Sequence, residues 1–119
     1  MLKWLSLALV ATGILHNALA FILMGDTLRR LWRSGLMAAV RANDAAAFAL
    51  LWFIVAGFAL MLIGAAFWQL ADAGRLGWSL ILGLWALAAG ICLLLPQPGP
   101  FLLLALASAF VLAKAGGAG

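Results

Sequence analysis

Acidic side chains are scarce in this chain, and none of them lies inside an apolar run. There is no glutamate, and the three aspartates are Asp26, Asp44 and Asp72. Each is expected at a helix end: Asp26 as an N-cap, Asp44 at the start of an apolar run, and Asp72 paired with Arg75. Proton- or sodium-coupled transport usually relies on a carboxylate within the membrane, and carboxylate metal sites need several. The sequence therefore argues against coupled transport and predicts no metal site.

Groups for covalent and redox chemistry are equally few. Cys92 is the only cysteine and His16 the only histidine. One cysteine excludes an internal disulfide, and one imidazole cannot supply both axial ligands of a haem without a second copy or a methionine. No acid–base or nucleophile–base pair is evident, so we predict no catalytic residues and no cofactor. An enzyme acting on a lipid or isoprenoid is the least favoured interpretation.

Charge is low overall, and hydrophobic residues dominate. Charged residues make up 8% of the 119 residues and hydrophobic residues 69%, whereas soluble domains carry about 25% charged residues. A small soluble domain buries only about 60–70% of its chain surface, so lipid must form part of the solvent. The net charge is +4, and the basic residues that produce it flank the apolar runs instead of lying among aromatic residues on a polar face. This pattern argues against a nucleic-acid partner and for a membrane.

Four apolar runs predict transmembrane helices at residues 4–24, 46–70, 78–95 and 101–114. The first, from Trp4 to Met24, covers roughly 30 Å at about 1.5 Å per residue, which matches the hydrocarbon core of a bilayer. We expect this run to be retained and not cleaved as a signal peptide. The proline-rich segment 96–100 predicts a tight turn, with the last two helices as antiparallel neighbours. The fold class is therefore all-α, a four-transmembrane-helix bundle in one membrane domain over residues 1–119.

An amphipathic helix is predicted between the first and second spans, at residues 26–41. Apolar residues recur there at three- and four-residue spacing, with basic and polar residues opposite: Leu28, Leu31, Trp32, Leu36, Ala39 and Val40 against Arg29, Arg30, Arg33, Ser34 and Arg41. Such a helix lies in the membrane interface. Arg29, Arg30, Arg33 and Trp32 are the candidate lipid-binding residues, for anionic lipids. Alternatively, the arginines only set the orientation of the protein in the membrane. Basic residues favour the cytoplasmic side, so this loop would be cytoplasmic and both termini outside; dual topology remains an alternative.

Polar side chains within the predicted spans form a second candidate site. His16 and Asn17 lie near the middle of the first span, with Thr12 one turn earlier and Ser108 in the last span. These four are the candidate ligand-binding residues. They could contact a ligand's polar group or accept a proton; alternatively His16 and Asn17 hydrogen-bond to neighbouring helices, for example through Ser108. Trp85, also within a span, requires a partner for its indole N–H.

Several short motifs carry a resemblance to a known family. Lys3-Trp4 is followed by Gly13-Ile14-Leu15-His16, then by Ser34-Gly35-Leu36 in an arginine-bearing segment, then by three further spans. This arrangement resembles an uncharacterised bacterial family of small four-helix integral membrane proteins, a domain of unknown function. The resemblance covers nearly the whole chain and implies a fold but no activity. The chain is also similar in size to small multidrug-resistance transporters, but its first helix lacks their membrane-embedded glutamate, which makes proton-coupled drug export doubtful.

Together these features predict a small multi-pass integral membrane protein of the bacterial inner (plasma) membrane. We expect a non-catalytic structural or accessory subunit, with anionic membrane lipids as partners and a homo-oligomer as one possible assembly. The alternative is a carrier or binder of a hydrophobic small molecule or lipid that uses a pocket around His16 and Asn17.

Overall fold

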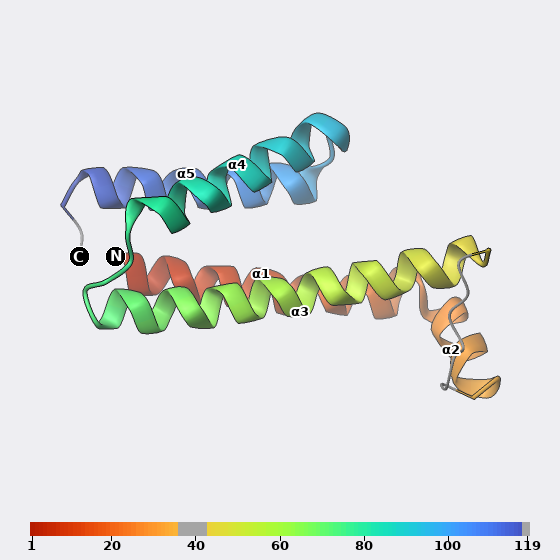
Figure 1. Cartoon of the computed structure of the whole chain (residues 1–119). Coiled ribbons are helices and arrows are strands. Elements are labelled where there is room, and N and C mark those ends of the chain that lie inside the picture. The colour runs from red at the N-terminus through yellow and green to blue at the C-terminus, as the bar shows by residue number, and fades with distance from the viewer. Residues whose placement is uncertain (36–42, 118–119) are drawn as a thin grey trace. The chain divides into compact units, whose positions relative to one another are not determined.

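The computed structural model describes residues 1–35 and 43–117 and is all-α over them (Figure 1). The helices described are α1 (Leu2–Leu23), α2 (Gly25–Arg33), α3 (Ala45–Asp72), α4 (Trp78–Leu94) and α5 (Pro98–Ala115). Of these, α1, α3 and α5 are long and apolar enough to cross a membrane, whereas α4 is apolar but has 17 residues. The predicted all-α class is confirmed over the described residues. Residues 36–41 of the predicted amphipathic helix lie outside them.

Helix α2 begins directly after a bend at the end of α1. Met24 is its N-cap, with φ −121° and ψ 22° and no side-chain capping bond. The predicted N-cap, Asp26, is therefore wrong: Asp26 lies in the first turn of α2, where its Oδ1 accepts a hydrogen bond from Arg29 Nη2 at 2.7 Å. A carboxylate in the first turn still favours the helix through the helix dipole. At the other end Gly35 adopts φ +84°, a conformation that suits glycine after a helix.

The two ends of α3 follow local signals in the sequence. Asp44 Oδ1 accepts a hydrogen bond from the backbone N–H of Ala47 at 3.2 Å, the bond that an aspartate N-cap makes. At the C-terminal end, Gly74 has φ +68° and donates to the carbonyl of Ala71, while Arg75 donates to the carbonyl of Leu70. This pair of bonds is the Schellman motif, and it ends the helix at Gly74.

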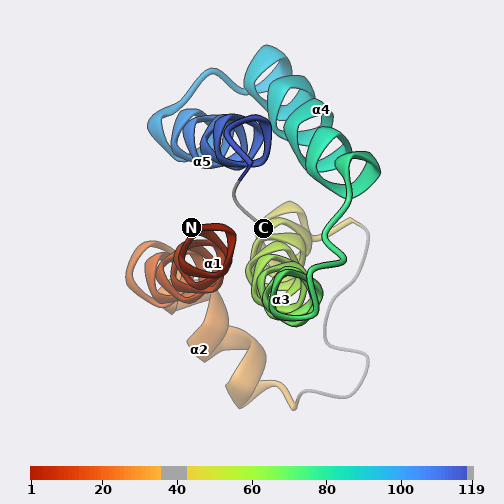
Figure 2. The ribbon, with the colours of Figure 1, turned by 90° about the vertical axis from the view of Figure 1, so that its left-hand side faces the viewer.

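Helices α4 and α5 form a hairpin. Helix α4 ends at Leu94, before Pro96, and α5 begins at Pro98, three residues earlier than the predicted span. A proline at the first helical position loses no intrahelical bond, so Pro98 starts the helix instead of delaying it. The two helices pack against each other and run back along one another (Figure 2). The prediction of antiparallel neighbours is confirmed.

The contacts divide the chain into two compact units. One consists of Met1–Val10 with Leu62–Gly119, and the other of Ala11–Met61. In the first, the rings of Phe67 and Phe110 meet edge to face, with centroids 5.4 Å apart. In the second, a buried cluster joins three helices: Ala20 from α1, Leu31 from α2, and Ala47 and Leu50 from α3.

Glycine allows α1 and α3 to approach closely within the Ala11–Met61 unit. A Cβ atom on Gly13 would lie 2.6 Å from the carbonyl oxygen of Gly57 and 2.8 Å from the backbone nitrogen of Met61. Both neighbours are backbone atoms, which cannot move aside without separating the helices. Small residues at a helix contact are the usual way for apolar helices to pack closely. The close approach places His16 and Asn17 against α3.

Candidate functional site

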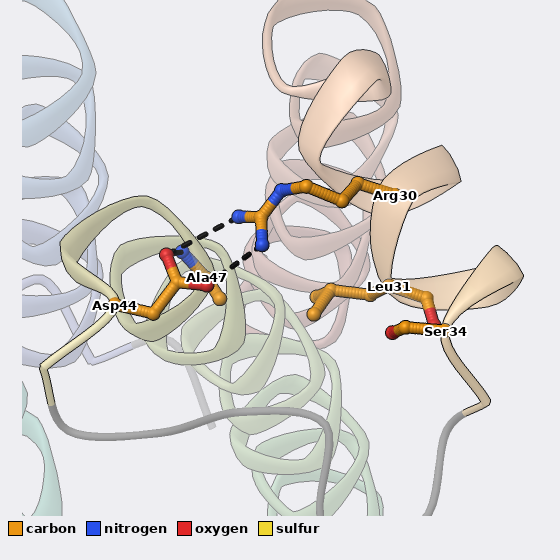
Figure 3. Close-up of polar contacts among 5 residues, drawn as sticks. All are labelled: Arg30, Leu31, Ser34, Asp44 and Ala47. Carbon is orange, nitrogen blue, oxygen red and sulfur yellow. Dashed lines mark hydrogen bonds and ion pairs between the residues drawn. The ribbon is translucent and has the colours of Figure 1, made fainter.

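Helix α2 is held within its unit by apolar packing and by an ion pair. Leu31 is buried in the cluster with Ala20 and Leu50. On a neighbouring face, the guanidinium of Arg30 donates to both carboxylate oxygens of Asp44, at 2.7 and 3.2 Å. Figure 3 shows Arg30 reaching from α2 to Asp44 at the start of α3. A two-point arginine–carboxylate contact has a defined geometry, so it holds α2 in a definite orientation against α3.

The same contact changes the titration of Asp44. The hydrogen bond from Arg30, followed by that from the Ala47 amide, holds the pKa of the Asp44 carboxyl below its ordinary value. Asp44 is therefore ionised at neutral pH, where it neutralises Arg30. The carboxylate serves both as the N-cap of α3 and as the ionic partner of α2.

The three candidate lipid-binding arginines have different surroundings. Arg30 is bound to Asp44, and Arg29 pairs with Asp26 at 2.7 Å across a largely solvated contact, since the Asp26 side chain is 96% exposed. Within the described part of the chain, Arg33 has no ion pair. Exposed ion pairs contribute little, roughly 0–1 kcal/mol. An anion could therefore reach Arg33 directly, and Arg29 in exchange for its weak, exposed pair with Asp26.

The structure brings all three arginines to one open hollow of about 460 Å³. Its lining consists of Asp26, Arg29, Arg30, Arg33 and Ser34. A second hollow of about 350 Å³, predominantly apolar, is lined by Phe21, Leu28, Arg29, Trp32 and Arg33. Trp32 is 71% exposed. Phe21 was not among the predicted site residues, because only the bend at Met24 brings the end of α1 against this face of α2.

The predicted polar pair on α1 lies against α3. The imidazole of His16 stacks on the ring of Phe53, with centroids 3.8 Å apart and planes 12° apart. Asn17 is 7% exposed, and its amide lies directly over Gly57. Among the described residues, His16 Nε2 and Asn17 Oδ1 are buried without a hydrogen-bond partner. A buried polar atom left unpaired costs about 1–3 kcal/mol, so two neighbouring cases require an explanation.

The other two predicted ligand-binding residues are placed as follows. Thr12 lies one turn before His16 on α1, within the same unit. Ser108 belongs to the other unit, where its Oγ accepts a hydrogen bond from Trp85 Nε1 at 3.1 Å. This bond joins α4 to α5 and supplies the partner that the Trp85 indole requires.

The predicted partner of Asp72 is wrong. Its carboxylate pairs with Lys3 Nζ at 2.9 Å, and that ammonium also lies 4.7 Å from the centroid of the Trp68 ring. Arg75 lies beyond the turn at Gly74, whereas Lys3 on α1 lies beside the last turn of α3. Asp72 is therefore paired with a residue of another helix, and not with the basic residue close to it in the sequence. Among the described residues, no group of three or more His, Cys, Asp or Glu side chains is placed to hold a metal ion.

Comparison with known proteins gives one match. A family model described as a family of unknown function (DUF6463) matches residues 1–117. No curated protein and no solved structure matches the chain.

Proposed function

The chain belongs to the DUF6463 family of unknown function, and we propose that it is a non-catalytic, multi-pass membrane protein whose α2 rests on anionic lipid. In this proposal α1, α3, α4 and α5 all cross the bilayer of a bacterial inner membrane as one domain over residues 1–119. Helix α2 lies along the interface as an amphipathic helix. The protein serves as a structural or accessory subunit.

Exposed apolar surface on α4 supports a fourth span. Leu93 and Leu94 are 85% and 88% exposed, which is unfavourable in water and favourable in lipid. At about 1.5 Å per residue, the 17 residues of α4 cover roughly 26 Å, slightly less than the hydrocarbon core. A modest mismatch of this kind is accommodated by local thinning of the bilayer. Because α4 packs against α5, the two helices enter the membrane together.

The charges and the tryptophan on α2 support an interfacial position, and they carry the proposal. Arg33 has no ion pair among the described residues, and Trp32 is largely exposed. Tryptophan prefers the membrane–water interface, and each cation near an anionic surface contributes about 1 kcal/mol. Asp26 and Asp44 offset part of the arginine charge, so the expected attraction is moderate and sensitive to salt.

The proposal is tested with an environment-sensitive fluorophore on α2 of the reconstituted full chain. Ser34→Cys in a Cys92→Ser background places the label beside Arg33. We expect blue-shifted emission in vesicles with phosphatidylglycerol, and a smaller shift at high salt or with phosphatidylcholine alone. In the same background, Arg29→Gln with Arg33→Gln should abolish the difference between the two lipids. Emission typical of water in every vesicle would show that α2 does not rest on the membrane.

A second function is favoured by one observation, the pair of unpartnered polar atoms on α1. His16 Nε2 and Asn17 Oδ1, of two consecutive residues, are both buried without a hydrogen-bond partner among the described residues. A hydrophobic small molecule with one polar group would satisfy them, which corresponds to a carrier or binder. A hydrogen-bond donor on another helix, including one from a second copy in a homo-oligomer, would satisfy them equally.

A further inference from the structure

Two rows of side chains run side by side along α2. Leu28 and Trp32 are four residues apart, and so are Arg29 and Arg33, so each pair lies one above the other on the helix surface. The bend at Met24 places Phe21, near the end of α1, against the apolar row. These five side chains line the apolar hollow of about 350 Å³. That volume falls within the range of about 300–1,000 Å³ that is usual for small-molecule sites.

The apolar hollow and the polar hollow share two residues. Arg29 and Arg33 line both hollows. They therefore lie at the boundary between the apolar hollow and the polar hollow. Arg30 lines only the polar hollow, and Asp44 occupies its guanidinium. An amphipathic molecule with its anionic group at the junction would therefore meet Arg33, which has no ion pair among the described residues, and Arg29, whose ion pair with Asp26 is exposed to solvent. Arginine suits phosphate because its planar donors bind two oxygens at once.

We propose that this junction binds a single molecule of an anionic glycerophospholipid. One acyl chain lies along Phe21, Leu28 and Trp32, and the phosphate lies between Arg29 and Arg33. The remainder of the headgroup occupies the polar hollow. This inference rests on the proposed interfacial position of α2 and adds a defined site with a stoichiometry of one.

Asp26 sets the kind of headgroup. Its carboxylate lines the polar hollow and already accepts a hydrogen bond from Arg29. The hydroxyl groups of a glycerol headgroup can donate to the carboxylate, whereas the trimethylammonium of phosphatidylcholine has no hydrogen to donate. The site therefore fits phosphatidylglycerol better than phosphatidylcholine. A zwitterionic lipid brings no net charge to the two arginines and is expected to bind more weakly.

Native mass spectrometry of the delipidated full chain tests the proposal, with phosphatidylglycerol and phosphatidylcholine as probes. We expect one phosphatidylglycerol to bind saturably, and phosphatidylcholine to bind at least about tenfold more weakly. Arg33→Gln should weaken phosphatidylglycerol binding about tenfold, because a charge-assisted hydrogen bond is lost. Inorganic phosphate, which has no acyl chain, should not displace the lipid.

Matched variants separate the site from general attraction. Arg75→Gln removes the same charge from the loop after α3, and Phe58→Ala removes a phenylalanine that is exposed elsewhere on α3. Both should bind as the unmodified chain does, whereas Phe21→Ala should bind less. Equal loss in Arg75→Gln and Arg33→Gln, or equal binding of the two lipids, would overturn the proposal. If the label on α2 responds to phosphatidylglycerol while no single lipid is retained, only the specific site fails and the interfacial position stands.

Discussion

Ser6 and Asn17 illustrate how the chain treats buried polar side chains at the scale of single residues. Both lie on α1 and both are buried. The hydroxyl of Ser6 donates to the carbonyl of Leu2 one turn earlier, at 2.8 Å, and so is satisfied within its own helix. Asn17 Oδ1 has no hydrogen-bond partner among the described residues. A serine in a membrane helix can be satisfied locally, whereas the Asn17 amide requires a group from outside its helix.

The residue-scale prediction concerns His16→Ala and Asn17→Ala. If these side chains serve a ligand, His16 Nε2 and Asn17 Oδ1 contribute no hydrogen bond to the protein without it, so each variant should keep its fold in detergent with at most a modest loss of melting temperature. Ser6→Ala is the control, since its hydroxyl bonds only to a carbonyl of its own helix, and its loss should change stability by less than about 1 kcal/mol. Thermal unfolding followed by circular dichroism measures all three. Loss of the folded protein in both His16→Ala and Asn17→Ala would favour hydrogen bonds between helices instead of ligand binding.

Elements of this chain are joined by ion pairs at their ends. Asp44 caps α3 through the Ala47 amide and binds Arg30 of α2, so one carboxylate couples two helices. At the other end of α3, Lys3 of α1 binds Asp72 and lies over Trp68. In both cases the residues that meet belong to different helices. Charges in this sequence therefore act at the helix ends, where water remains accessible.

The element-scale prediction uses Asp44→Asn, which keeps a good N-cap and removes the charge that binds Arg30. The folded pKa of Asp44 is lowered, so its contribution is fully present above the unfolded pKa of about 3.9 and is lost as pH falls through the lower folded value. At pH 7 the melting temperature of the variant should be lower than that of the unmodified chain. The difference should shrink on acidification below about pH 4.

Arg30→Gln removes the other partner and provides the control. It should resemble Asp44→Asn at pH 7, and combining the two changes should add little, because both remove the same contact. Melting curves at intervals from pH 7 to pH 3 give the comparison. A difference between Asp44→Asn and the unmodified chain that persists unchanged at pH 3 would contradict the role given to the ionised carboxylate.

At the scale of the whole molecule, the number of spans decides where the ends of the chain lie. If α1, α3, α4 and α5 all cross the membrane, both termini lie on one side and α2 on the other. If α4 does not cross, the C-terminus lies on the same side as α2. The three arginines on α2 favour the cytoplasmic side for that helix. The position of the C-terminus therefore tests the four-span proposal directly.

The whole-molecule prediction is measured with single cysteines in the Cys92→Ser background. Ser34→Cys reports on α2 and Gly116→Cys on the C-terminal end. In intact bacterial cells we expect a membrane-impermeant maleimide to label Gly116→Cys and not Ser34→Cys, and to label both after permeabilisation. If both positions are labelled in intact cells, or both only after permeabilisation, they lie on the same side of the membrane. The number of spans would then be odd, which contradicts the four-span proposal. Partial labelling of each position in intact cells would indicate dual topology.

Local features of the sequence determined the helices and most of their ends. Gly74 and Asp44 act through hydrogen bonds that reach no further than four residues along the chain, so their roles follow from the sequence. The lengths of the apolar runs also depend only on the local sequence, and they predicted the bounds of the long helices to within a few residues. The N-cap of α2 was predicted at Asp26 but is Met24, two residues earlier, which has no side chain that can cap a helix. The observed position depends on how α1 ends.

Only the tertiary structure decided which side chains meet. The long helices are predominantly apolar, and although the small or polar residues Ser6, Gly13, Asn17 and Ala20 mark the buried side of α1, such a pattern does not say which side chains meet across helices. Lys3 therefore replaced Arg75 as the partner of Asp72, and Phe21 joined Leu28 and Trp32 at the apolar hollow without a signal in the sequence. The candidate lipid site depends on the bend at Met24, which turns α2 against the end of α1. The sequence alone determined that arginines and a tryptophan share a short helix. The packing of that helix decided that Arg30 binds Asp44 of another element, while Arg29 pairs only with Asp26 of its own helix and Arg33 has no ion pair among the described residues.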